Sequence, residues 1–414
     1  MKEKTKVELL APCGSFESLS AAVKAGADSV YFGIEQLNMR TRSSNNFTMA
    51  DLSAIKTICN AYNVKTYLTL NTILYNHDIN LMKGIVDAAS ENKIDAIIAS
   101  DHAVFNYAKK VGIPLHISTQ ANITNIDTVE FYATYADVMV LSRELTLDQV
   151  FEITEEIKKR NVRGPSGECV RVEVFAHGAL CMAVSGKCYM SLHTDFASAN
   201  RGACVQNCRR SYIVTDKESG NEFEIQNEYI MSAKDLCTIG FLDKITEAGV
   251  SVVKIEGRAR GEEYVHTVTK CYREAIDSIS DNTYSKNKIE DWTKELSTVF
   301  NRGFWDGYYL GRKMGEWNDE YGSKATIKKI YIGKGLKYFE KIGIGEFKIE
   351  SQSLEVGDQV MISGPTTGII QTEIKEMRIN DIKTKIAKRG ETISIPVHEK
   401  IRASDKLYKM KKSI

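Results

Sequence analysis

Over residues 1–281 the sequence alternates between short apolar runs and longer stretches with helical periodicity. Eight apolar runs, rich in β-branched residues, recur at 7–12, 29–33, 64–70, 95–100, 114–121, 137–142, 171–178 and 250–257. Nearly continuous apolar runs are typical of strands that are buried on both faces of a parallel sheet. Eight strands that are each followed by a helix predict an α/β fold, the TIM-like (β/α)₈ barrel of about 250 residues. A doubly wound open sheet is the alternative, and it is weakened because no G-x-G-x-x-G motif follows the first run.

The chain divides into three parts by composition. The predicted barrel covers 1–281 and contains a cysteine-rich insertion at 178–237, and a helical, then aromatic connector follows at 282–323. From 324 to 414, short alternating runs separated by Gly, Asn or Pro predict a small all-β barrel domain. This part holds 16 Lys and 3 Arg against 11 Asp and Glu, although the net charge of the whole chain is only +1. A basic surface favours nucleic acid, and a solvated lysine face explains the same charge equally well.

The first residues, MKEKTK, are charged and pass directly into the first apolar run, so no signal peptide is expected. Charged residues interrupt every apolar run, so no membrane span is expected either. These features predict a cytoplasmic protein, in which thiols stay reduced and stable disulfides are rare. Clustered cysteines in such a protein are more often metal-binding or catalytic than structural.

Five cysteines fall within the predicted insertion. They are Cys181, Cys188, Cys204, Cys208 and Cys237, with the spacing C-x6-C-x15-C-x3-C-x28-C. Structural zinc sites usually take two tight C-x2–4-C pairs, whereas iron–sulfur clusters tolerate irregular spacing from different loops. The spacing therefore favours an iron–sulfur cluster, with zinc, redox thiols and plainly buried cysteines as alternatives. Of the other cysteines, Cys59 and Cys271 are expected to be buried. Cys13 and Cys169 have no predicted role.

Functional side chains of parallel barrels come from the carboxyl ends of the strands. Here those ends and the loop after the second strand offer Arg40, Asn71, Gln120, Arg143, His177, Glu256 and Arg258, together with Cys13 and Asp101. Arginines at one rim could hold a dicarboxylate by bidentate hydrogen bonds, although a loop salt bridge is the commoner use of a single arginine. Glu256 is expected either to move a proton with a raised pKa or to anchor Arg258 or Arg143. His177 is a candidate base, a neighbour of the cluster or a packed rim residue.

The connector contains FNRGFWDGYYLG (300–311), which could offer aromatic faces to an unpaired base, with Arg302 and Arg312 nearby. Packing against the barrel is the more common role of such a segment. A base in a tRNA loop is already single-stranded, so a pocket at the barrel rim could receive it at modest unstacking cost.

The segments ELLAPCGSFESLSAAVKAGADSVYFG, HISTQANITN, SAKDLC, AGVSVVKIEGRARGEEYV and FNRGF, together with the cysteine insertion, resemble peptidase family U32, the collagenase-like peptidases. The resemblance covers nearly the whole chain. It implies either a peptidase, as the family is named, or an oxygen-independent hydroxylation protein. Several members hydroxylate the wobble uridine of tRNA, a ribosomal RNA base or ubiquinone precursors, with prephenate implicated in the RNA reactions. The two-domain length and the basic β tail resemble the tRNA hydroxylation protein P branch of the family.

The resemblance also implies a [4Fe–4S] cluster on four cysteines, which the ubiquinone-type members of the family carry. One family pattern maps onto Cys181, Cys188, Cys204 and Cys237, and this set is the prediction. A sister pattern uses both cysteines of C-x3-C, which brings in Cys208 as the alternate ligand. Zinc remains the less favoured metal.

Three functions are therefore expected, and the first is iron–sulfur-dependent, oxygen-independent hydroxylation of an RNA base. Its expected substrate is the tRNA wobble uridine, which becomes 5-hydroxyuridine, and prephenate is the expected hydroxyl donor. The site of this reaction is expected to use Glu256, Arg258, His177, Arg143, Asn71, Gln120 and Arg40.

The second expected function is a U32-type peptidase, which is weakened because the chain has no H-E-x-x-H or G-x-S-x-G motif. The third is a non-enzymatic iron–sulfur or zinc adaptor. Expected partners are RNA, above all tRNA, and a second family-member subunit, but neither a membrane nor DNA.

Overall fold

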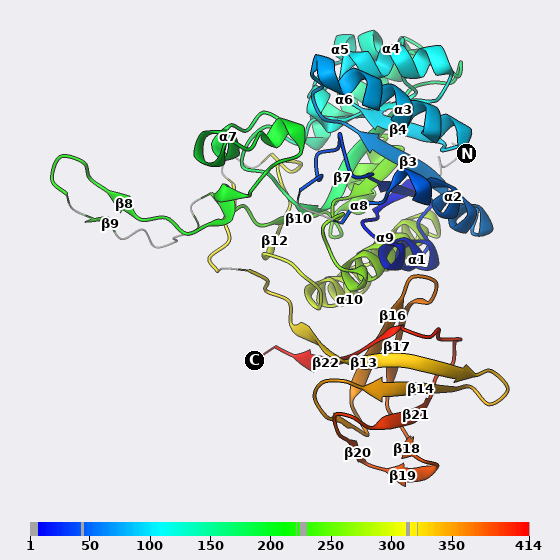
Figure 1. Cartoon of the computed structure of the whole chain (residues 1–414). Helices are drawn as coiled ribbons and strands as arrows, with labels where there is room; N and C mark the ends of the chain where they lie inside the picture. Colours follow the sequence, from blue (N-terminus) through cyan, green and yellow to red (C-terminus); the bar gives the residue numbers. More distant parts are fainter. Residues whose placement is uncertain are drawn as a thin grey trace.

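The structure is a computed structural model that describes residues 7–42, 45–220, 222–223, 229, 231–311, 315–320 and 322–413. Arg312 therefore lies outside the described residues. The described chain forms a barrel domain, an insertion at one rim of the barrel, and a β domain that packs against the side of the barrel (Figure 1).

Eight parallel strands close into a ring at the centre of the first domain, as predicted (Figure 1). They are β1 (Glu8–Pro12), β2 (Ser29–Phe32), β3 (Lys65–Leu70), β4 (Ala96–Ala99), β5 (Leu115–Ile117), β6 (Val138–Val140), β7 (Arg171–Ala179) and β11 (Val252–Ile255). Each strand pairs with the next in this order, and β11 pairs with both β7 and β1. This closure excludes the doubly wound open sheet.

Helices cover the outside of the barrel. They are α1 (Phe16–Lys24), α2 (Leu52–Ala61), α3 (Ile79–Glu91), α4 (His102–Val111), α5 (Ile126–Ala133), α6 (Leu147–Lys159), α8 (Leu242–Glu247) and α9 (Glu262–Ser280), with the 3₁₀ turns η1 (Met49–Asp51), η2 (Asn76–Asp78) and η3 (Thr119–Ala121) in the loops. Local sequence sets where several helices begin, because Ser15, Asp101 and Asn125 accept hydrogen bonds from the first turns of α1, α4 and α5. The apolar helix faces pack on outward strand residues such as Leu9 and Leu68.

The inside of the barrel is charged where β1, β7 and β11 meet. Arg171 donates to the Glu8 carboxylate at 2.7 Å, and the Tyr67 hydroxyl donates to the same carboxylate at 2.7 Å. Further along the strands, Lys254 Nζ donates to Glu173 Oε1 at 2.7 Å, and these two side chains are 6% and 0% exposed. Charges this deeply buried are tolerated because they are paired.

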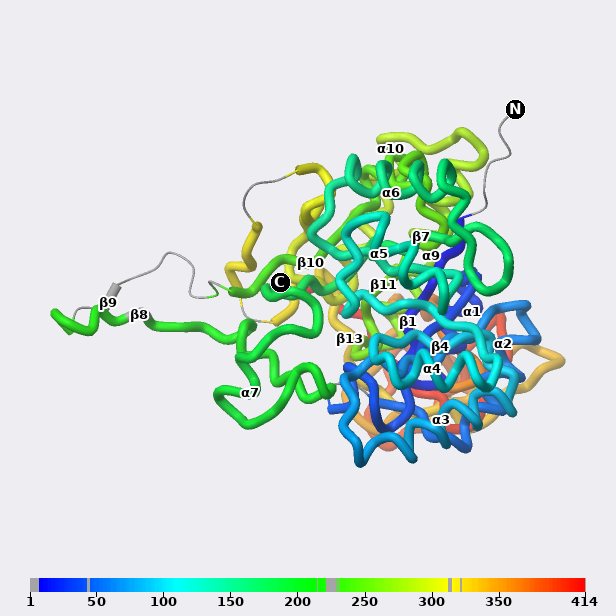
Figure 2. The backbone as a smooth tube through the Cα atoms, turned by 90° about the horizontal axis from the view of Figure 1, so that it is seen from above, coloured from blue at the N-terminus to red at the C-terminus, as the bar shows by residue number. Residues whose placement is uncertain are grey.

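A long insertion follows β7. It holds α7 (Met190–Asp195), the 3₁₀ turns η4 (Ala199–Arg201) and η5 (Asn207–Arg209), and the strands β8 (Val214–Thr215) and β9 (Glu222–Phe223). β8 and β9 form an arm that projects away from the barrel in both views (Figures 1 and 2). β10 (Asp235–Cys237) then returns antiparallel to β7. The insertion therefore begins and ends beside β7.

The connector is formed by α10 (Lys286–Ser297) and β12 (Phe304–Trp305), and β12 pairs with β10. Its aromatic segment packs against the barrel domain. Trp305 is 5% exposed, and Tyr309 is 4% exposed and donates to the Phe175 carbonyl at 2.8 Å. These two rings are therefore not free to stack on a nucleic-acid base.

The last part of the chain forms an antiparallel β domain, which confirms the prediction of a small all-β unit here. Its strands are β13 (Ile327–Phe339), β14 (Ile344–Ile349), β15 (Leu354–Glu355), β16 (Gln359–Gly364), β17 (Gly368–Glu373), β18 (Met377–Ile379), β19 (Ile382–Thr384), β20 (Ile386–Ala387), β21 (Thr392–Pro396) and β22 (Lys406–Lys412). One sheet has the order β17-β16-β22-β13-β14-β21-β18-β19 and packs around its own core, which includes Phe347 and Ile362. The domain contacts α9 of the barrel, where Lys329 pairs with Glu263 at 2.6 Å.

Candidate functional site

A cavity of about 130 Å³ lies at the carboxyl ends of the barrel strands, against the cysteine insertion. Its wall combines residues that lie far apart in the sequence. From the barrel come Arg40, Asn71, Gln120, Arg143, Glu256 and Arg258, and from the insertion come Cys181, Cys188, Cys204 and Cys208. Of the side chains that the sequence places in the site, His177 and Cys237 do not line this cavity.

The four cavity cysteines share one electrostatic environment. Cys181 is exposed, the other three are half-buried, and all four are free thiols. Burial raises the pKa of the Cys208 thiol, Arg209 opposes that rise, and Cys181, Cys204 and Cys188 add to it. Thiols that influence one another's ionisation lie close together. The irregular spacing C-x6-C-x15-C-x3-C therefore converges in space.

The four thiols surround a cavity and not a single point. Among the described residues, no three His, Cys, Asp or Glu side chains lie close enough to hold one metal ion. A polynuclear cluster differs from a single ion, because its irons and sulfides fill the space between four thiolate ligands. Thiolates ligate both iron–sulfur clusters and zinc, so the four cysteines are chemically suitable ligands for either group.

The insertion is fastened to the rim by contacts that sequence reasoning missed. Arg201 pairs with the buried Asp78 at 2.6 Å. Arg209 donates to the Leu180 carbonyl at 2.7 Å and so joins the two ends of the cysteine segment. A Cβ atom at Gly202 would collide with a backbone carbonyl after β2, so this close approach requires glycine. Two short motifs could have indicated these contacts, because N-R-G and C-R-R place arginines beside the turns that carry the cysteines.

Glu256 lies among three guanidinium groups. Arg40 donates through Nη2 to Glu256 Oε1 at 2.7 Å, and the Tyr31 hydroxyl lies 3.3 Å from Glu256 Oε2. Burial raises the pKa of Glu256, but the positive charges of Arg40, Arg143 and Arg258 outweigh burial and hold this pKa at about 2. Glu256 is therefore ionised at neutral pH. Its ion pair is with Arg40, not with Arg258 or Arg143 as predicted from the sequence, although the charges of those two arginines also act on it. Of the two roles expected for it, the proton carrier with a raised pKa is not supported.

Arg258 and Arg143 retain hydrogen-bonding capacity at the cavity. Arg258 donates through Nη1 to Asn38 at 3.1 Å and to Thr69 at 2.8 Å, and Arg143 donates through Nη1 to the Ala179 carbonyl at 2.9 Å. Burial lowers the pKa of Arg258 to about 10, which leaves it charged at neutral pH. The Nε of each arginine is buried and has no hydrogen-bond partner among the described residues. An acceptor brought by a ligand would relieve that cost.

Asn71 and Gln120 add neutral polar groups to the cavity wall. Asn71 Nδ2 donates to Gln120 Oε1 at 3.3 Å and to Ser118 Oγ at 3.4 Å. Asn71 Oδ1 accepts from the Met39 N–H at 3.2 Å, which fixes the orientation of this amide. Side-chain amides carry both donors and acceptors, so the wall can complement the edge of a heterocyclic base.

His177 and Cys237 lie together at a different place. They are paired across β7 and β10, and the Tyr272 hydroxyl lies 3.4 Å from His177 Nδ1 and 4.0 Å from Cys237 Sγ. Burial lowers the pKa of His177 to about 3, and burial raises the pKa of Cys237 to about 11. The structure thus places His177 as a packed rim residue and puts Cys208, in place of Cys237, beside the other three cysteines.

The remaining rim candidates have structural surroundings. Cys13 is 1% exposed, and burial raises its pKa. Asp101 caps α4 and also accepts from the Leu74 N–H at 2.9 Å. Cys59 and Cys271 are both 0% exposed, which confirms the expectation that they are buried.

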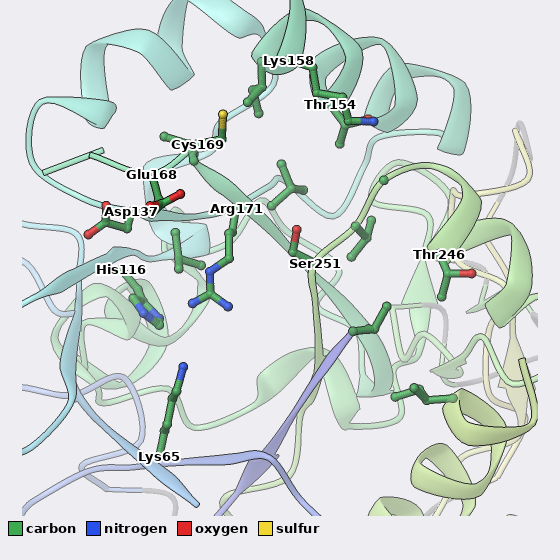
Figure 3. Close-up of a pocket in the computed structure, with 18 of the residues that line it drawn as sticks. Lys65, His116, Asp137, Thr154, Lys158, Glu168, Cys169, Arg171, Thr246 and Ser251 are labelled. Carbon is green, nitrogen blue, oxygen red and sulfur yellow. The ribbon is translucent and has the colours of Figure 1, made fainter. Parts of the chain in front are cut away.

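A larger pocket, of about 1140 Å³, lies at the opposite mouth of the barrel (Figure 3). It is lined by Lys65, His116, Asp137, Cys169 and Arg171, among others. Arg171 is paired with Glu8 in the barrel interior, and Asp137 accepts from the Ser166 N–H at 3.0 Å. The cavity cysteines and the rim arginines are absent from its lining. We therefore take the smaller rim cavity as the candidate active site.

A closed (β/α)₈ barrel whose rim cavity gathers charged and thiol side chains has the architecture of a barrel enzyme. The chain matches the model of "Peptidase family U32" over residues 14–319 and belongs to that family, as predicted. A relative named "Collagenase" from Porphyromonas gingivalis is 58% identical over 405 residues, which is 98% of each chain. The "tRNA hydroxylation protein P" of Helicobacter pylori is 33% identical and covers 74% of this chain and 72% of its own.

A third relative is the "23S rRNA 5-hydroxycytidine C2501 synthase" of Escherichia coli. It is 30% identical over 321 residues, which are 75% of this chain and 46% of the relative. The family therefore includes proteins named for RNA hydroxylation beside proteins named as collagenases. Within the described part of the chain, no helix combines the length and apolar character that a membrane crossing requires.

Proposed function

We propose that this protein is an oxygen-independent RNA hydroxylase that holds a [4Fe–4S] cluster on Cys181, Cys188, Cys204 and Cys208. The proposed substrate is the wobble uridine of a tRNA, and the proposed product is 5-hydroxyuridine. The proposed hydroxyl donor is a dicarboxylate such as prephenate. One observation carries the proposal: four thiols and a set of arginines line the same cavity at the barrel rim.

The chemistry requires a donor of the hydroxyl group. Replacing a C–H bond of the base by a C–OH bond oxidises the base by two electrons, and the donor that gives up its hydroxyl group and takes the hydrogen is reduced by two. A bound iron–sulfur cluster supplies electron transfer or Lewis acidity to such a reaction. The remaining tasks, which are binding and orientation of the two substrates, fall to the side chains of the cavity.

Arg143 and Arg258 suit the donor. Each carries a fixed positive charge and a buried Nε without a partner among the described residues, so each can add a hydrogen bond to a carboxylate. Glu256 holds Arg40 beside them and reduces the repulsion between the guanidinium groups. Asn71 and Gln120 are the proposed contacts to the edge of the base.

The β domain is the proposed contact to the RNA backbone. Lys334 and Lys409 are paired with carboxylates, at 2.9 Å and 2.7 Å. Such pairs lower the charge that is available to phosphates. Lys411 and Lys412 are exposed at the end of β22 and are better placed for that contact. A second family-member subunit stays a prediction.

A peptidase is the second candidate, because a relative with 58% identity is named "Collagenase". A cysteine peptidase needs a thiolate activated by a neighbouring histidine. His177 and Cys237 are paired across two strands, but burial keeps both groups neutral at pH 7. His177 is also only 1% exposed, which denies a peptide access to this base. The rim cavity therefore favours hydroxylation over peptide hydrolysis.

The test is mass spectrometry of tRNA nucleosides from cells that lack the protein. Loss of 5-hydroxyuridine and its derivatives, restored by the unaltered protein and not by Cys188→Ser or Cys204→Ser, is the expected result. An unchanged tRNA profile would remove tRNA as substrate and direct the same measurement to ribosomal RNA. Gelatin digestion that survives both cysteine substitutions would favour the peptidase instead.

A further inference from the structure

A second depression, of about 500 Å³, lies on the same rim as the cysteine cavity. It is bounded by the loops after β1, β2 and β11, and we call it the rim pocket; its lining includes Ser15, Ser18, Arg42, Arg258, Arg260 and Glu262. We propose that the rim pocket binds a phosphate group of the RNA strand whose base enters the cysteine cavity. This inference rests on the proposed function.

Two helices begin at the rim pocket. Ser15 is the N-cap of α1, and Gly261 is the N-cap of α9, a helix of 19 residues. Helix amino termini present unpaired backbone N–H groups and the positive end of the helix dipole, and both favour phosphate. Gly261 offers no side-chain cap, but the Glu262 carboxylate accepts from its own backbone N–H at the start of α9, and Ser15 accepts from the Ser18 N–H at the start of α1. Glu17 in the first turn of α1, and Glu262 and Glu263 in that of α9, offset part of the potential of the two amino termini, so the arginines of the lining carry the argument.

Three arginines supply an independent indication of an anionic ligand. Arg258 is 5% exposed and lines both the rim pocket and the cysteine cavity. Arg42 is exposed at the edge of the pocket. The guanidinium of Arg260 lies 3.5 Å above the Phe300 ring, which holds it in place. Three guanidinium groups around one depression are a setting that suits phosphate oxygens.

The acidic residue in the lining does not cancel this charge. Glu262 is paired with Lys329 of the β domain at 3.2 Å and accepts from Ser363 at 3.1 Å. Its carboxylate is therefore directed to the β domain. The same contact makes the rim pocket continuous with the basic domain, so a polyanion can follow from one to the other.

Arg258 is the reason to assign the phosphate to the substrate strand. It lines both the rim pocket and the cysteine cavity, so a phosphate in the first lies one side chain away from a base in the second. The base and the phosphate of one nucleotide are separated by a similarly short distance. A free phosphate ion has the same chemistry, and the experiment below separates the two sources.

The first arm measures binding of a labelled anticodon stem-loop RNA by fluorescence anisotropy at several salt concentrations. Arg42→Gln and Arg260→Met, which keeps an apolar stem on Phe300, are each expected to weaken binding about ten-fold. Each should also reduce the slope of log K against log salt by about 0.7. The loss should be equal for an RNA with a changed loop base, because phosphate contacts do not read sequence. Arg163→Gln, an exposed arginine at the opposite mouth, is the matched control and should change neither quantity.

The second arm titrates inorganic phosphate into the same proteins by calorimetry. Phosphate binding that Arg42→Gln abolishes, with RNA affinity unchanged, would assign the pocket to a free phosphate and overturn the strand assignment. Failure of the unaltered protein to bind the RNA would overturn it too.

Hydroxylated product is measured by mass spectrometry on the same preparations. If hydroxylated product forms but neither Arg42→Gln nor Arg260→Met weakens RNA binding, the phosphate assignment of the rim pocket is wrong and the proposed function stands. If both substitutions weaken RNA binding but no hydroxylated product forms, the proposed function is wrong and the phosphate assignment stands.

Discussion

Replacing Glu256 by glutamine removes the carboxylate that faces Arg40, Arg143 and Arg258 in the rim cavity. Glutamine has nearly the same shape, so the packing is retained and the lost quantity is the negative charge. Three guanidinium groups then lie close together at a site where Glu256 itself is 13% exposed. We expect the barrel to lose stability, because removing one partner of a buried ion pair leaves the other charge uncompensated.

The magnitude follows from the pKa of Glu256. In the folded protein it is lowered from 4.5 to about 2, because the three arginines outweigh the effect of burial. A depressed carboxyl pKa contributes stability that is present above the unfolded-state pKa and is lost as pH falls through the folded-state pKa. The shift corresponds to roughly 3 kcal/mol at pH 7, and the contribution falls to roughly 2 kcal/mol near pH 3.5. Glu256→Gln should therefore destabilise the barrel by roughly 3 kcal/mol at pH 7 and by less in acid.

Tryptophan fluorescence during urea unfolding can measure this loss. The three tryptophans, Trp292, Trp305 and Trp317, all precede the β domain, so the signal reports the barrel and its connector. The experiment compares the unaltered protein with Glu256→Gln at pH 7 and near pH 3.5, with the exposed Glu91→Gln as the control. Equal stability of Glu256→Gln and the unaltered protein at pH 7 would refute the reasoning. So would a difference that does not shrink in acid.

Three further predictions follow from the placement of the site. Cys208→Ser should remove the brown colour of anaerobically purified protein, whereas Cys237→Ser should retain it; equal loss in both would contradict the proposed ligand set. Arg143→Lys should raise the KM for a dicarboxylate donor about ten-fold, because an ammonium cannot reproduce bidentate binding, and an unchanged KM would count against that role. His177→Gln should lower thermal stability by about 1–3 kcal/mol but leave the pH profile of activity unchanged between pH 5 and 8, because burial lowers the pKa of His177 to about 3. Disappearance of an ionisation from that profile would show that His177 takes part in the reaction.

The barrel could be predicted because its strands are buried on both faces. Each apolar run is short and is followed by a helix with one apolar face, and this alternation has few solutions other than a parallel sheet. Closure of the ring could be expected from the number of strands, and it is observed as the pairing of β11 with both β7 and β1. The charged interior could not be predicted, because Glu8 meets Arg171, and Glu173 meets Lys254, through long-range pairing alone.

The residue types of the candidate site could be predicted from the sequence, but not every residue that lines it. Strand ends are known positions, and that is why Arg143, Glu256 and Arg258 could be named in advance. The choice between Cys208 and Cys237 depends on the direction of β10, which returns antiparallel to β7 and carries Cys237 away from the cavity. Spacing along a sequence does not encode the direction of a short strand inside an insertion.

The ion pairs inside the barrel link electrostatics to the order of events in folding. Glu8 belongs to the first strand and its partner Arg171 to the seventh, and Glu173 on the seventh finds Lys254 on the eighth. These charges are therefore paired only when the ring closes. The ring cannot close until the insertion between the last two strands and the last strand itself have been synthesised. A chain truncated before Val252 lacks both β11, which closes the ring, and the ammonium group that pairs with Glu173. We therefore expect that the first domain needs all eight strands to form a stable barrel.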